Sequence, residues 1–109
     1  MQLSPFPFSI TDFTALEPEI HKGITGHAEW RVLYRDDTRI RLVTYSPGYL
    51  ADHWCSKGHI IFCLEGAMVT ELKDGSKHLL SKGLMYTVGD NSDAHRTFSE
   101  EGCVLFIVD

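Results

Sequence analysis

The chain has 109 residues, a formal net charge of −5, and 43% hydrophobic residues. This length supports one hydrophobic core and excludes two ordinary domains, and the scattered basic residues provide no positive face for binding a nucleic acid. No uncharged apolar stretch reaches the roughly 18 residues that span a membrane, and the N-terminal residues lack a basic and apolar secretion signal, so we expect a soluble cytoplasmic protein.

Residues 1–28 are predicted to form an irregular or strand-like arm. Pro18 interrupts the segment 11–22, which has no sustained helical periodicity and therefore holds at most one helical turn. From Glu29 onward, short runs of Val, Ile, Leu, Tyr and Phe are separated by turn residues at intervals of about 8 to 12 positions, which is typical of an all-β fold. We therefore expect an arm at 1–28 and a barrel at 29–109.

Turn residues divide the barrel region into nine expected strands. The clearest turn is Asp74-Gly75, because this pair can supply both positive-φ positions of a two-residue hairpin. Many short strands with short links favour a closed double-sheet barrel, whose interior can hold a ligand or a metal. The expected strands are 29–35, 38–45, 50–55, 59–65, 67–73, 76–81, 84–88, 94–98 and 103–108.

The three cysteines do not suggest a disulfide framework. Their number is odd and no secretion signal precedes them, so free or metal-bound thiols are the better interpretation. Cys63 and Cys103 lie in apolar runs and are expected to behave as small core residues. Cys55 is different, because it lies among histidines.

His53, Cys55 and His59 form a dense group of metal-ligand types. If 50–55 is a strand, His53 and Cys55 point to the same face, because side chains alternate along a strand. A tight turn at 56–58 then brings His59 back beside them. This pattern predicts a chelating hairpin, with His95 as a fourth ligand from a later strand.

The neighbours of this group are expected to face away from it. By strand alternation, Trp54 packs between sheets or at a dimer interface. Asp52 lies on the same face as Trp54, where it is a turn or surface carboxylate or pairs with Arg39 or Arg41. The aromatic residues of the strands, Tyr86 among them, could narrow a pocket mouth but are expected mainly to fill the barrel.

These motifs resemble the cupin superfamily. Asp52-His53-Trp54-Cys55 is similar to the Asp-His-Cys-Trp set that gives its name to a group of small, single-domain, RmlC-like cupins. In the first cupin motif, Cys55 stands where a second His is usual and His59 stands where a Glu is usual. The second motif ends at His95. The resemblance implies a cupin double-stranded β-helix, a metal held by His53, Cys55, His59 and His95, and a homodimer.

The expected metal is zinc. Three histidines and a thiolate leave a divalent ion with the same net charge as three histidines and a carboxylate, but they are softer ligands. Such a set favours zinc, with iron, nickel or copper as alternatives, over magnesium, calcium or manganese. A coordinated thiolate also disfavours dioxygenase chemistry, because it would compete for oxidation. Cys55 has a second interpretation, as a small buried thiol beside a metal held by three histidines.

The resemblance implies metal binding but leaves the reaction undetermined. One hypothesis is an enzyme that uses the metal on a small oxygen-bearing substrate. A second is a non-catalytic barrel that binds or senses a small ligand or a metal. A third is zinc that only stabilises the barrel. The four predicted ligands could also be hydrogen-bonded core residues in a barrel without a metal. No residue spacing identifies a catalytic base, and the fold by itself does not choose.

Overall fold

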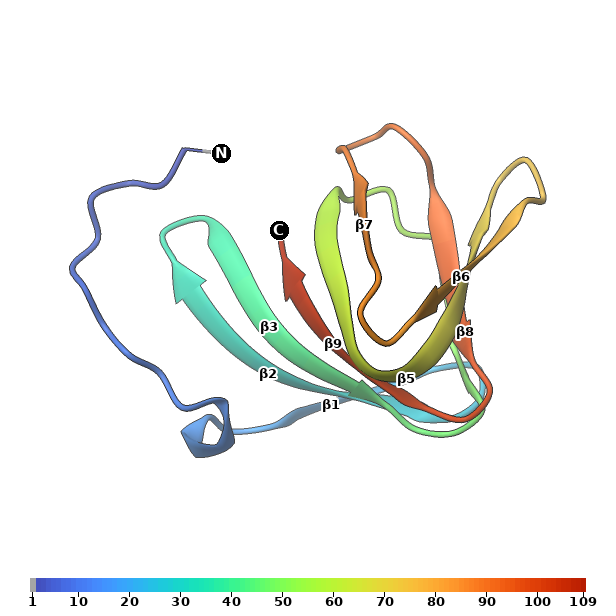
Figure 1. Ribbon diagram of the computed structural model, residues 1–109, viewed down its shortest axis with the longest axis horizontal. Helices are drawn as coiled ribbons and strands as arrows, with labels where there is room; N and C mark the ends of the chain where they lie inside the picture. The colour runs from blue at the N-terminus through green and yellow to red at the C-terminus, as the bar shows by residue number, and fades with distance from the viewer. Residues whose placement is uncertain (1) are drawn as a thin grey trace.

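The computed structural model describes residues 2–109, which form a curled antiparallel β-structure (Figure 1). A single short helix, η1, precedes the strands. No helix in this part of the chain is long and apolar enough to cross a membrane. The elements are η1 (Phe13–Ala15), β1 (Glu19–Lys22), β2 (His27–Arg35), β3 (Thr38–Tyr45), β4 (Tyr49–Leu50), β5 (His59–Leu72), β6 (Lys77–Ser81), β7 (Met85–Val88), β8 (His95–Ser99) and β9 (Cys103–Val108).

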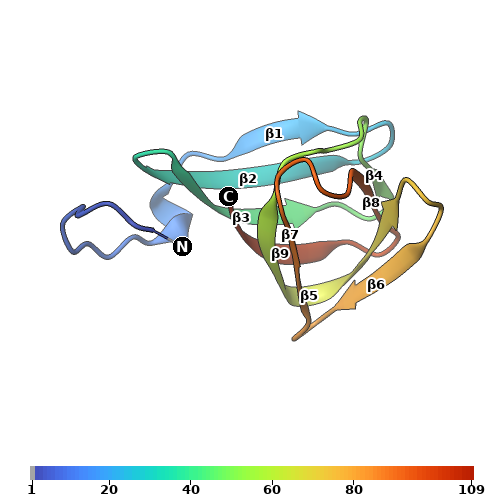
Figure 2. The same cartoon turned by 90° about the horizontal axis from the view of Figure 1, so that it is seen from above.

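The strands follow the order β1-β2-β3-β9-β5-β8-β4, and β6 and β7 also pair with β5. The first part of β5 pairs with β7 and β9, whereas its second part pairs with β6 and β8. β5 therefore belongs to both walls of the barrel, and Figure 1 shows it bending from one wall into the other. Seen from above, β2, β3 and β9 lie side by side in the wall that begins with β1 (Figure 2).

The predicted division between strands 59–65 and 67–73 is wrong, because β5 is one continuous bent strand. The register against β9 shifts between Cys63 and Glu65. Gly66 follows with a φ of 75°, and a Cβ atom there would clash with the carbonyl oxygen of Gly102. A bulge followed by a glycine bends a strand without ending it.

Gly66→Ala is expected to lower the free energy of unfolding by about 2 kcal/mol or more, because it combines a left-handed backbone with a steric clash. Gly75→Ala is the matched control. Its φ is 88°, but no atom lies within 4 Å of the added Cβ, so only the backbone cost of about 1 kcal/mol remains. Urea unfolding measures both variants. Equal losses would contradict the proposed close approach at the bend.

Apolar side chains from both walls meet inside the barrel. Val43 of β3 and Cys63 of β5 are both paired with Leu105 of β9. The prediction that Cys63 and Cys103 are core residues is confirmed, because both are buried free thiols. The buried apolar residues are Ala28, Val43, Tyr49, Ile61, Cys63, Met68, Leu80, Cys103, Leu105 and Ile107.

The predicted strand at 50–55 is wrong beyond its first residue. β4 ends at Leu50 and pairs with β8 rather than with β5. The chain continues beside β8, since the backbone N–H of Cys55 donates to the His95 carbonyl at 2.8 Å, but residues 52–53 bend out of the ladder. Strand alternation therefore does not apply between His53 and Cys55, and the chelating hairpin is not formed.

The N-terminal segment is attached to the outside of the barrel (Figure 1). The one helical turn expected in 11–22 is η1. β1 pairs with β2 and extends the sheet. Arg31 Nη1 donates to the carbonyl of Leu16 at 2.7 Å, and the ring of Phe13 meets Phe106 edge-on with centroids 6.4 Å apart. These contacts cover the outer face of the wall whose inner face lines the candidate site.

Candidate metal centre

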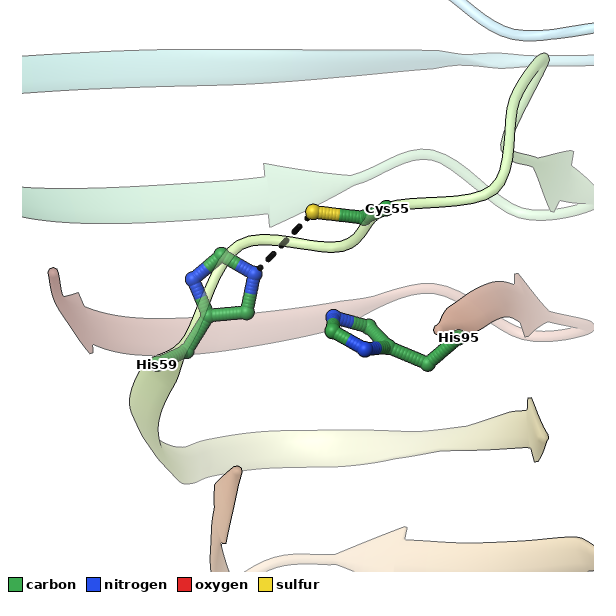
Figure 3. A group of neighbouring side chains, drawn as sticks. All are labelled: Cys55, His59 and His95. Atoms are coloured by element: carbon green, nitrogen blue, oxygen red, sulfur yellow. Dashed lines mark hydrogen bonds between the residues drawn. The ribbon is translucent and has the colours of Figure 1, made fainter. Parts of the chain in front are cut away.

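Cys55, His59 and His95 lie together inside the barrel, with one potential ligand atom from each within 4.8 Å of the others (Figure 3). Cys55 comes from the segment after β4, whereas His59 and His95 are the first residues of β5 and β8. Three of the four predicted ligands are thus brought together by three different parts of the fold.

Backbone contacts hold these three residues in place. Cys55 and His95 exchange two backbone hydrogen bonds, at 2.8 and 3.0 Å. The start of β5 is fixed by the backbone N–H of Gly58, which donates to Asp90 Oδ1 at 2.7 Å. As a result, the Sγ atom of Cys55 lies 3.4 Å from Nε2 of His59, the contact drawn in Figure 3.

The orientation of His59 is set by a buried carboxylate. Its Nδ1 donates to Oδ2 of Asp109 at 2.7 Å, which leaves the lone pair on Nε2, the atom that faces Cys55. Metal-binding histidines are commonly held in this way, with one ring nitrogen on a carboxylate and the other on the ion. Asp109 is therefore a positioning residue for the candidate ligand.

His95 carries the clearest sign of a missing partner. Its Nδ1 donates to the carbonyl oxygen of Asp93 at 2.9 Å. Its Nε2 is buried and has no hydrogen-bond partner among the described residues, an unfavourable state for a buried polar atom. Burial lowers the pKa of His95, which favours the neutral imidazole that binds metals. The donor set and this orphaned nitrogen fit a metal ion.

Asp109 is the centre of a buried ionic group. Its side chain is 1% exposed and accepts hydrogen bonds from Arg39 Nε at 2.8 Å and Arg41 Nη2 at 2.8 Å, as well as from His59. Burial acts to raise the pKa of Asp109, but the hydrogen bonds from His59 and Arg39 and the charge of Arg41 outweigh it and hold this pKa well below its usual range. Asp109 is therefore ionised at neutral pH.

His53 lies apart from the cluster. Its side chain is 72% exposed, and Nδ1 is 2.6 Å from Oδ1 of Asp52. Asp52 therefore pairs with His53, and Arg39 and Arg41 pair with Asp109 instead. His53 does line the same cavity as the cluster, so its role as a metal ligand stays a prediction.

Trp54 points outside the candidate centre. Lys73 Nζ lies 4.0 Å from the centroid of its ring, and Arg96 Cζ lies 4.9 Å from it. Two cations thus flank a half-buried indole, an arrangement in which the ring quadrupole attracts both. Trp54 is therefore held by contacts within the chain.

A cavity of about 320 Å³ contains the cluster. Tyr86 lines it, and its hydroxyl is buried without a hydrogen-bond partner among residues 2–109. Burial raises the pKa of Tyr86 to about 12, so the hydroxyl keeps its proton. A more apolar hollow of about 340 Å³ near β6 and β7 reaches His95 but neither Cys55 nor His59. The cavity of about 320 Å³, which contains all three cluster residues, is therefore the candidate site.

The fold and the site together define an all-β barrel with a candidate metal centre in its cavity. No protein-family model matches the sequence, and no curated protein matches it, but solved structures do. A protein from Neisseria meningitidis shares 27% identity with a TM-score of 0.60, over 73% of this chain and 80% of that one. An RmlC-like cupin from Shewanella frigidimarina shares 19% with a TM-score of 0.66, over 99% and 92%.

A predicted oxalate decarboxylase from Thermotoga maritima has a TM-score of 0.76 at 15% identity, over 92% of this chain and 96% of that one. The chain therefore has the cupin fold, as the motifs predicted. At this level of identity the likeness shows the fold and not the reaction. The similarity to the Asp-His-Cys-Trp group remains a resemblance.

Sequence reasoning missed two residues of the site. Asp109 follows the apolar strand β9, and a lone carboxylate after a buried strand is the one signal that could have pointed to it. Arg41 shares a strand face with Val43, a core residue. A charged residue on the core-facing side of a strand is a signal for a buried ion pair. Tyr86, expected mainly to fill the barrel and otherwise to narrow a pocket mouth, lines the cavity.

Proposed function

We propose that this protein binds zinc through Cys55, His59 and His95 and acts as a metal-dependent enzyme on a small oxygen-bearing substrate in the cavity. The observation that carries the proposal is the buried, unpartnered Nε2 of His95 in a cluster whose ligand atoms lie within 4.8 Å. A metal ion would give this nitrogen a partner, and no described residue provides one.

The donor types support zinc. One thiolate with two imidazoles suits this ion, and iron, nickel or copper would also accept it, whereas magnesium and calcium require oxygen donors. The hydrogen bonds from His59 to Asp109 and from His95 to the Asp93 carbonyl supply the outer contacts that orient metal ligands.

Three protein ligands and a vacant fourth position are the pattern of catalytic zinc sites. A zinc ion bound in this way supplies a Lewis acid that polarises a carbonyl group or activates water. The chain's own contribution is a narrow cavity and the protonated hydroxyl of Tyr86, whose ring centroid lies 6.3 Å from that of His95. In this proposal the hydroxyl would donate a hydrogen bond to a substrate oxygen.

A closed site is the second candidate, and it would need His53 to move from its exposed position to the cluster. His53 lines the cavity, and because Asp52 holds its Nδ1, the Nε2 atom is free to bind. If His53 joined the other three residues, all four positions of a tetrahedral zinc would be occupied. That arrangement suits sensing or structural stabilisation rather than catalysis.

Elemental analysis of the protein purified without a metal-affinity tag, combined with zinc-edge X-ray absorption, tests the proposal. We expect one zinc per chain, with one sulfur, two nitrogen neighbours and an exchangeable oxygen. One sulfur with three nitrogens and no oxygen would establish the closed site instead. His95→Ala should lower the zinc content, whereas His78→Ala, at an exposed histidine bonded to Ser76, should not. Absence of zinc after reconstitution would refute both candidates.

A further inference from the structure

Arg41 is a buried cation with unused hydrogen-bond donors. It lies on the inner face of β3, is 4% exposed, and lines the cavity that holds the metal cluster. Its guanidinium lies 4.4 Å from the centroid of the Trp30 ring. Of its five N–H donors, one on Nη2 bonds to Asp109, and Nε has no partner among the described residues.

The charges around Arg41 do not balance. Asp109 receives two hydrogen bonds from Arg39, at 2.8 and 3.1 Å, and one from Arg41. One side-chain carboxylate thus faces two guanidinium groups, and among residues 2–109 no second carboxylate side chain pairs with Arg41. Burying an uncompensated charge is costly, although the face of Trp30 offsets part of that cost. An anion in the cavity would remove the imbalance.

The other charged side chains in the cavity wall are also positive. Arg39, Arg41, Lys57 and Arg96 line it, and no Asp or Glu side chain does, although the whole chain has a net charge of −5. Arg96 is already paired with Glu71 at 3.0 Å, and Arg39 with Asp109. Lys57 is exposed to water. Arg41 is therefore the buried cation of this wall that lacks a full partner.

We propose that Arg41 forms a subsite for the carboxylate group of a small organic acid. A single uncompensated charge matches a monoanion, and a charge-assisted hydrogen bond from a guanidinium suits a carboxylate. The cavity of about 320 Å³ has the volume of roughly ten water molecules, at about 30 Å³ for each, which is enough room for a small organic acid. This inference deepens the proposed function and rests on it for the reaction, since a second oxygen of the acid would be the group that faces the metal cluster.

Pyruvate and its neutral amide, pyruvamide, make a matched pair of probes. Isothermal titration of the zinc-loaded protein should show pyruvate binding at least about tenfold more tightly than pyruvamide. Arg41→Met should weaken pyruvate binding by about 10- to 100-fold, the range for one charge-assisted hydrogen bond, and Arg41→Lys should recover part of the loss. Arg35→Met is the matched control, because Arg35 lies outside the cavity, where it bonds to Ser9, and it should change binding by less than about twofold.

Several results would overturn the subsite. Equal binding of pyruvate and pyruvamide, equal losses in Arg41→Met and Arg35→Met, or no binding of either probe would do so. Tighter, Arg41-dependent binding of inorganic phosphate would show that the subsite takes a phosphate group rather than a carboxylate. If Arg41→Met does not fold, the comparison of the two probes on the unaltered protein decides.

The same titration on metal-free protein separates this inference from the proposed function. Arg41-dependent binding of pyruvate to a protein that takes up no zinc would refute the metal-dependent enzyme and support the subsite. Stoichiometric zinc without binding of either probe would refute the subsite and leave the metal centre standing.

Discussion

Cys55→Ser is expected to weaken zinc binding by more than about 100-fold. The substitution replaces a soft, charged thiolate with a neutral hydroxyl, whereas even the loss of a residue that only supports a metal ligand costs about 10- to 100-fold. Cys55 lies 3.4 Å from Nε2 of His59 and bridges His95 through its backbone, so the serine should keep its position while losing the bond. Competition with a chromophoric zinc chelator measures the change.

Cys63→Ser makes the same atomic change at a thiol of the core. It should lower stability and leave zinc affinity within about threefold, a difference of less than 1 kcal/mol. Unchanged zinc affinity in Cys55→Ser would mean that Cys55 only lines the cavity. Histidines would then hold the ion, and His53 would have to be among them.

Asp109→Asn is expected to lower the free energy of unfolding of the metal-free protein by about 3–5 kcal/mol, the usual cost of breaking a buried ion pair. The carboxylate is 1% exposed and serves Arg39, Arg41 and His59 at once. An amide leaves both guanidinium groups without a counter-charge. Urea unfolding measures the loss.

Glu71→Gln is the control for Asp109→Asn. It removes a carboxylate from the Arg96 pair, whose side chains are 33% and 28% exposed, and should cost less than about 1 kcal/mol. A loss in Asp109→Asn as small as in this control would show that the buried ionic group contributes little to stability. The zinc affinity of Asp109→Asn should also fall by about 10- to 100-fold, because a neutral amide replaces the charged acceptor that orients His59.

Strand prediction succeeded where turn residues delimit a run of β-forming residues. The strands expected at 38–45 and 103–108 match β3 and β9 at both ends. It was wrong where a strand bends or leaves its ladder. Gly66 indicated a break, yet β5 passes through it by means of a bulge, because β9 and β6 pair with its two parts.

The prediction of the candidate site was likewise correct in part and wrong in part. Residue chemistry in the sequence selected Cys55, His59 and His95, and the structure brings them together, but not by the predicted hairpin. Cys55 reaches the site through its bridge to His95. His53, chosen by strand alternation from Cys55, lies apart from the cluster and pairs with Asp52, because the backbone bends there.

The sequence by itself determined the all-β class and the ligand types, because these depend on local patterning and on the chemistry of side chains within short segments. The cupin fold was implied by the resemblance of its motifs. Only the tertiary structure decided which carboxylate is buried with Arg39 and Arg41, and which ring nitrogen of each histidine stays free. Asp109 lies about 70 positions from Arg39, and the pairing of β3 with β9 brings them together. Contacts of this kind depend on strand register across the whole sheet, which no local pattern encodes.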